Sequence, residues 1–119
     1  MRRILGRDSE QLANAPVLDQ VAALEQAVLC NPVLALLLEV VPALGMPHWY
    51  LGAGGVTQTV WNLLHGFGPG EGIKDYDVVY FDPAELNGAG EHELERRAMS
   101  LLGHAGVHVD VTNEARVHL

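Results

Sequence analysis

Two aspartates separated by one residue, Asp75 and Asp77, begin the apolar segment "DYDVVYFD". On a β-strand, residues two apart project from the same face, about 6.6 Å apart along the chain. Carboxylates that lie so close repel each other, and each resists ionisation unless a cation sits between them. Mg²⁺ takes one or two carboxylates and completes its shell with water and substrate phosphates. The pair therefore predicts a site for Mg²⁺, or Mn²⁺, that handles a phosphorylated substrate.

A glycine-rich segment, "LGAGGVTQ", precedes these acids, between an expected strand at 48–51 and an expected helix at 56–66. Gly54 and Gly55 carry no side chain that would block a triphosphate, and the first turn of a helix offers free N–H groups to phosphate. Thr57 adds a hydroxyl donor. Two metal ions about 3.5–4 Å apart would stabilise the attacking and leaving oxygens of a phosphoryl displacement. The segment predicts a nucleoside triphosphate site.

The same residues allow other interpretations. A dinucleotide-binding turn needs a glycine where this chain has Thr57, and an acid at the far end of the next strand, where Asp82 stands. A Walker-type phosphate loop fails because Lys74 is not preceded by glycine and followed by serine or threonine. Asp75 and Asp77 also fit a solvent-facing strand entrance partly neutralised by Lys74.

The elements around these motifs follow from apolar spacing and from turn residues. A helix begins after Pro16, a second begins at Asn31-Pro32, and strands are expected at 76–81 and 107–111. The order α-α-β-α-β-α-β predicts an α/β (α+β) fold, a small mixed sheet flanked by helices. We expect a single domain over 1–119, composed of a frayed start (1–15), a helical part (16–45) and the core (46–119).

Composition excludes several function classes. The formal charge is −8, from 15 acidic against 7 scattered basic residues, so a nucleic-acid duplex is not an expected partner. No apolar run approaches the length of a membrane span, and a single cysteine, Cys30, suits a reducing cytoplasm. We expect Cys30, Trp49 and Trp61 to fill the core.

The histidines and the last aspartate need separate treatment. The six histidines form no zinc-ligand spacing: His48, His65, His92, His104, His108 and His118. In "VHVDV" the valines share one face, which places Asp110 with His108 on the other face. That second face is either exposed to solvent or part of an active site, and the pattern is compatible with both.

Three segments together resemble a bacterial family of nucleotidyltransferases within the DNA-polymerase-β-type superfamily: "WYLGAGGVTQTVWNLLHG", "DYDVVYFDP" and "NEARVHL". The resemblance runs from about His48 to Leu119. It implies a nucleotidyltransferase-like fold and transfer of a nucleoside monophosphate from a triphosphate to an unknown acceptor hydroxyl.

Residue by residue, the resemblance implies that Gly54 and Gly55 cradle the nucleotide and that Asp75 and Asp77 bind metal. Asp110 would be the third carboxylate, as a metal ligand or as the base for the incoming hydroxyl.

The chain departs from the family at three places. Thr57 stands where the family tends to have arginine, the 66–74 loop is longer, and the family continues past "ARVHL". We therefore also consider a C-terminally truncated, non-catalytic domain that binds a nucleotide or a partner. The chain is expected to stop in mid-strand at Leu119, which favours a homo-oligomer paired through that strand.

Overall fold

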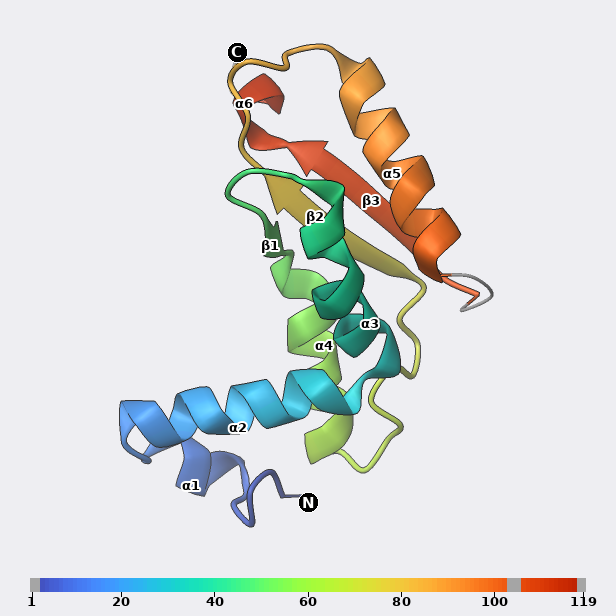
Figure 1. Ribbon diagram of the computed structural model, residues 1–119. Coiled ribbons are helices and arrows are strands. Elements are labelled where there is room, and N and C mark those ends of the chain that lie inside the picture. The colour runs from blue at the N-terminus through green and yellow to red at the C-terminus, as the bar shows by residue number, and fades with distance from the viewer. Residues whose placement is uncertain (1–2, 103–105, 118–119) are drawn as a thin grey trace.

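The computed structural model describes residues 3–102 and 106–117 (Figure 1). A three-stranded sheet has the order β1-β2-β3, with β1 antiparallel and β3 parallel to β2. This arrangement confirms the predicted mixed sheet flanked by helices. The elements are α1 (Ser9–Ala13), α2 (Val17–Cys30), α3 (Pro32–Val40), the 3₁₀ helix η1 (Val41–Leu44), β1 (Tyr50–Leu51), α4 (Ala53–Leu64), β2 (Asp75–Tyr80), α5 (Gly88–Leu102), β3 (His108–Asn113) and α6 (Glu114–Val117).

The two faces of the sheet differ in character because side chains alternate along each strand. One face of β2 and β3 is buried and apolar, and it consists of Tyr76, Val78, Tyr80, Val109 and Val111. The alternate positions are exposed or half-buried, and they include both aspartates of β2. The sheet thus anchors its apolar face in the core and presents its polar face outward.

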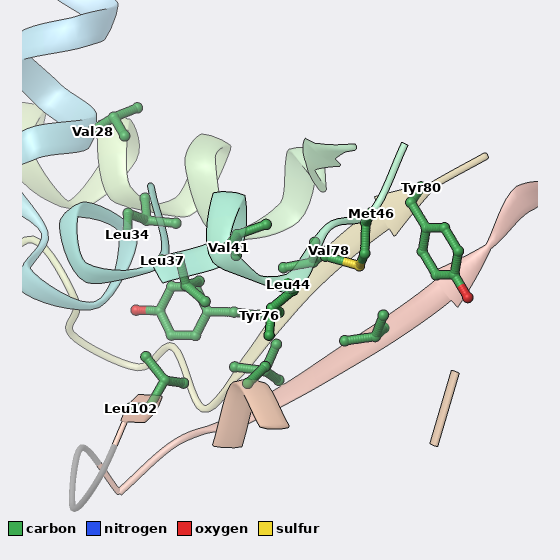
Figure 2. Close-up of a cluster of buried hydrophobic side chains, with 13 residues drawn as sticks. Val28, Leu34, Leu37, Val41, Leu44, Met46, Tyr76, Val78, Tyr80 and Leu102 are labelled. Carbon is green, nitrogen blue, oxygen red and sulfur yellow. The ribbon is translucent and has the colours of Figure 1, made fainter. Parts of the chain in front are cut away.

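The apolar face packs against helices on one side of the sheet. Figure 2 shows Leu34, Leu37, Val41 and Leu44 of α3 and η1 gathered around Tyr76 and Val78 of β2. Helix α5 runs alongside β3 and adds Ala98 and Leu102 to the same cluster (Figure 1). A second, smaller cluster joins α2 to α4 and to the N-terminal segment through Ile4, Ala23 and Ala27.

One buried asparagine links three elements. Asn31 caps α3, where its Oδ1 accepts hydrogen bonds from the backbone N–H groups of Val33 (2.9 Å) and Leu34 (3.4 Å). Its Nδ2 donates to Thr59 Oγ1 of α4 and to Tyr76 Oη of β2, both at 3.0 Å. The predicted cap at Asn31 is confirmed, and it also fixes α3 against α4 and the sheet.

Two predictions of local structure need correction. Residues 1–15 are not wholly frayed, because Ser9–Ala13 is helical and Asp8 with Gln11 forms a capping box. Gly54 and Gly55 of "GAGG" and both glycines of "NGAG" lie within the first turns of α4 and α5 rather than in loops before them, and Gly52 is the N-cap of α4.

The predicted stop in mid-strand falls on Leu119, which lies outside the described residues. Within them, strand β3 ends at Asn113 and is followed by the short helix α6. Side chains of α5 cover part of the outer edge of β3. Val109 N–H lies 3.3 Å from Met99 Sδ, and Val111 N–H donates to Glu95 Oε1 at 3.1 Å. Pairing of two chains through a C-terminal strand stays a prediction.

Two expected core residues are at the surface. Cys30 is exposed at the end of α2, and Trp61 is 56% exposed and stacks on His65 with ring centroids 4.0 Å apart. Trp49, by contrast, packs half-buried against the main cluster. Helical spacing correctly identified the apolar side of α4. Trp61 lies at the edge of that side, where its indole stacks on the imidazole of His65 instead of entering the core.

Among the described residues, no single helix has the length and hydropathy to cross a bilayer. Helix α2 and the segment Pro32–Leu44 reach that length and composition only together, and they meet at a bend of 98°.

An ion pair between the buried Glu91 and the exposed Arg116 ties α5 to α6. Glu91 is 7% exposed, and its carboxylate accepts hydrogen bonds from Nε and Nη2 of Arg116. The hydrogen bond from Arg116 lowers the pKa of Glu91 below its ordinary value. A lowered pKa means that the stabilisation is complete above the unfolded-state pKa and is lost as the pH falls through the folded-state value.

We expect Glu91→Gln to lower the melting temperature at neutral pH, because Arg116 loses its ionic partner. The difference from the unmodified chain should shrink toward zero as the pH falls from neutral through the lowered folded-state pKa of Glu91, below which the native carboxyl is also protonated. Thermal unfolding across this range measures it. Glu93→Gln, which removes the exposed pair with Arg96, is the control and should change the melting temperature less. An equal effect of the two variants at every pH would contradict the stabilising role of the ion pair between Glu91 and Arg116.

Candidate active site

The polar face of the sheet collects the predicted acids. Parallel register pairs Asp75 with His108 and Asp77 with Asp110, so these four side chains project from the same face of β2 and β3. Adjacent strands lie about 4.8 Å apart, which makes Asp110 the nearest neighbour of Asp77 across the sheet. Both β2 aspartates are exposed and Asp110 is half-buried. The fold therefore brings three carboxylates together at the entrance of the parallel strands.

The start of α4 lies directly against these acids. The N–H of Gly52, the N-cap of α4, donates to the backbone oxygen of Asp77 at 2.7 Å. A methyl group on Gly52 would lie 2.7 Å from Cβ of Asp77, so only glycine allows this approach. Gly55 packs against the ring of Tyr76, whereas Gly54 has open space where a side chain would be. The N–H groups of Ala53, Gly54 and Gly55 are in the first turn of the helix, where no preceding helical carbonyl is available to accept their hydrogen bonds.

A cavity of about 260 Å³ joins the helix start to the acids. Its walls come from α4, from the loop before β2 and from β2 itself: Gly54, Gly55, Gln58, Gly72, Ile73, Lys74, Asp75 and Asp77. The loop is held in place by the buried Asn62, whose Nδ2 donates to the carbonyls of Pro69 (3.1 Å) and Glu71 (2.8 Å). The long loop is thus a fixed wall that brings the cation Lys74 to the cavity.

His108 adds a partial counter-charge to the acidic face. Its Nε2 lies 2.9 Å from Asp110 Oδ1 and 3.9 Å from Glu95 Oε1 of α5. The hydrogen bond with Asp110 raises the pKa of His108, and the negative charges of Asp110, Glu95 and Asp75 act in the same direction. The face therefore favours positive charge, supplied by imidazolium or by a cation.

The structure brings most of the predicted site residues together. Gly54, Gly55, Asp75 and Asp77 line one cavity, and Asp110 adjoins it from β3. Thr57 is exposed in the second turn of α4 and is not among the lining residues; Gln58 takes that place.

Sequence reasoning missed two further side chains near these acids. Glu95 contributes to the acidic face from a helix, and Asn62 holds the loop wall. Their roles depend on contacts between elements that the sequence around each residue does not show.

The two glycines of the helix start give a matched test of this geometry. We expect Gly52→Ala to destabilise the protein by about 2 kcal/mol, because the new methyl group forces β2 away from α4. Gly54→Ala should leave stability unchanged or slightly raised, since its methyl group meets no atom within 4 Å and alanine favours helix. Chemical denaturation measures both. Equal stability of the two variants would contradict the close contact of Gly52 with Asp77.

A glycine-rich helix start facing paired aspartates on an adjacent strand defines a nucleotidyltransferase-like domain. A family model described as "Nucleotidyltransferase" matches residues 39–119, and the chain belongs to this family. Such enzymes transfer phosphorus-containing groups. A search of curated proteins finds no match.

A solved structure gives the same fold. An NMR structure described as revealing a CCA-adding enzyme head domain is similar with a TM-score of 0.65 and 25% identity. The match covers 82% of this chain and 49% of the other, so the chain spans about half the length of that protein. The similarity confirms the nucleotidyltransferase head-domain fold.

Proposed function

We propose that this domain transfers a nucleoside monophosphate from a nucleoside triphosphate to an acceptor hydroxyl. The observation that carries the proposal is the single cavity lined by the start of α4 and by Asp75 and Asp77. Free N–H groups at a helix start bind phosphate, and paired carboxylates bind the cations that accompany it. The family assignment and the head-domain likeness support this class of reaction.

The donor set fits Mg²⁺ or Mn²⁺. Asp75, Asp77 and Asp110 supply three carboxylates on one face of the sheet, and hard divalent cations prefer oxygen ligands. These residues would hold the ions. When bound, the cations would neutralise the phosphates and stabilise the charge that develops on the attacking and leaving oxygens.

The residues of the chain position the reactants. The N–H groups of Gly54 and Gly55 donate to phosphate oxygens, and Lys74 at the cavity wall offsets the charge of the departing pyrophosphate. Asp110 lies beside Asp77 on the neighbouring strand and accepts a hydrogen bond from the acceptor hydroxyl. The new bond joins the acceptor oxygen to the α-phosphorus, the bond to the pyrophosphate oxygen breaks, and the hydroxyl proton passes to Asp110 and from there to solvent. Catalysis of this kind rests on positioning and charge stabilisation.

Incubation with α-labelled nucleoside triphosphates and Mg²⁺ or Mn²⁺ tests the proposal. We expect pyrophosphate release together with transfer of the label to a hydroxyl-bearing acceptor, and loss of both on chelation. Candidate acceptors are small alcohols, proteins and RNA ends, tested separately. Nucleotide binding without pyrophosphate release under all conditions would contradict transfer and favour the non-catalytic binding domain. Stabilisation by NAD, but not by a triphosphate with Mg²⁺, would favour a dinucleotide-binding module.

A further inference from the structure

Three side chains from α5 and β3 form a ligand cluster beside the polar face. One oxygen of Glu95, one nitrogen of His108 and one oxygen of Asp110 all lie within 4.8 Å of one another. His108 Nε2 is at the centre, 2.9 Å from Asp110 and 3.9 Å from Glu95. Around a single zinc-sized ion, neighbouring ligand atoms are about 3–3.5 Å apart. The two separations from His108 Nε2 lie on either side of that range, so small side-chain movements would close the cluster on an ion.

The scaffold holds two of these groups in place. Glu95 Oε1 accepts the N–H of Val111 at 3.1 Å, which orients its carboxylate toward β3. The backbone N–H of His108 donates to Lys74 O at 2.8 Å, which fixes the start of β3 against the loop before β2. All three side chains are between 27% and 49% exposed, so an ion has access from solvent.

The donor chemistry separates this cluster from the aspartate pair of β2. Asp75 and Asp77 offer oxygen alone, which suits Mg²⁺. An imidazole with two carboxylates suits Zn²⁺ and related transition metals, which bind nitrogen more readily than Mg²⁺ does. The two groups of ligands therefore differ in the metals that they would prefer.

We propose that Glu95, His108 and Asp110 form a binding site for a transition-metal ion such as Zn²⁺, distinct from the site at Asp75 and Asp77. Three protein ligands leave coordination positions open for water. Asp110 belongs to both groups, so an ion at this site would draw Asp110 away from the β2 aspartates and compete with nucleotidyl transfer. That consequence rests on the proposed function; the binding of the ion does not.

Calorimetric titration of the full chain with Zn²⁺ in excess Mg²⁺, without nucleotide, tests the site. We expect one Zn²⁺ per chain, and we expect Glu95→Gln and His108→Gln each to weaken binding by at least about tenfold. Both substitutions preserve hydrogen bonding, since a glutamine oxygen still accepts from Val111 and a glutamine NH₂ still donates to Asp110. Melting temperatures close to that of the unmodified chain would show that the variants fold.

Two controls locate the ion. Asp75→Asn and His92→Gln should bind Zn²⁺ as the unmodified chain does, because neither side chain is in the cluster. Unchanged affinity in His108→Gln would overturn the proposal. So would an equal loss in His92→Gln, which would assign the binding to scattered surface imidazoles, or an equal loss in Asp75→Asn, which would place Zn²⁺ on the β2 aspartates. None of these results depends on transfer activity, so the proposed function is tested separately.

Discussion

Asp77→Asn is expected to lower nucleotidyl transfer by about a thousandfold and to abolish Mg²⁺-dependent nucleotide binding, because it removes the central carboxylate of the site. Asp77 neighbours Asp75 along β2 and Asp110 across the sheet, so an ion bound by either of these carboxylates would also contact Asp77. Turnover is measured as pyrophosphate release, and binding as the shift in melting temperature with ATP and Mg²⁺.

The folded structure should survive this substitution. The Asp77 side chain is exposed, and its contact with Gly52 is made by backbone atoms. Removing one of three neighbouring negative charges should leave the melting temperature without metal unchanged or slightly raised. Asp82→Asn, just beyond the end of the same strand, is the matched control and should keep full activity. Unchanged ATP–Mg²⁺ affinity in Asp77→Asn would refute the assignment of the metal site.

Asn31→Ala should lower the free energy of unfolding by about 3 kcal/mol, more than the loss of an exposed helix cap. Loss of the cap of α3 accounts for about 1 kcal/mol. The remainder comes from the interior, where Tyr76 Oη loses its bond from Asn31 and Thr59 Oγ1 keeps only the bond that it donates to Gly55 O. An unpaired polar group there costs about 1–3 kcal/mol. Urea denaturation measures the free energy of unfolding.

Asn87→Ala separates capping from the buried network. Asn87 is exposed and accepts the N–H of Ala89 at the start of α5, so this variant should lose about 1 kcal/mol. Similar losses in the two asparagine variants would mean that the contacts of Asn31 with α4 and β2 contribute nothing, and would contradict the stabilising role of the buried network.

Much of the site was predictable because it rests on short-range patterns. The alternation of "DYDVVY" showed which face of β2 is polar, and the valines of β3 did the same for Asp110. The cap at Asn31 followed from an asparagine before a proline at a helix start. Each of these features depends on residues close in sequence, where spacing alone determines direction.

The remainder depended on contacts between distant residues. Nothing near Glu95 in the sequence shows that it reaches the N–H of Val111 at the edge of β3. The glycines of "GAGG" suggested a turn, yet close contact with Asp77 and Tyr76 explains Gly52 and Gly55 better than backbone freedom does. The exposure of Cys30 and Trp61 was missed because helical spacing identifies the apolar side of a helix but not how much of that side other elements cover.

A crystal structure with Mn²⁺ and a non-hydrolysable nucleoside triphosphate tests the central claim most directly. We expect an anomalous peak for Mn²⁺ within about 2.3 Å of carboxylate oxygens of Asp75 and Asp77. The phosphates should lie over the first turn of α4, next to Gly54. A triphosphate bound away from that turn, or Mn²⁺ found at Glu95 and His108 with none at the β2 aspartates, would contradict the proposed active site.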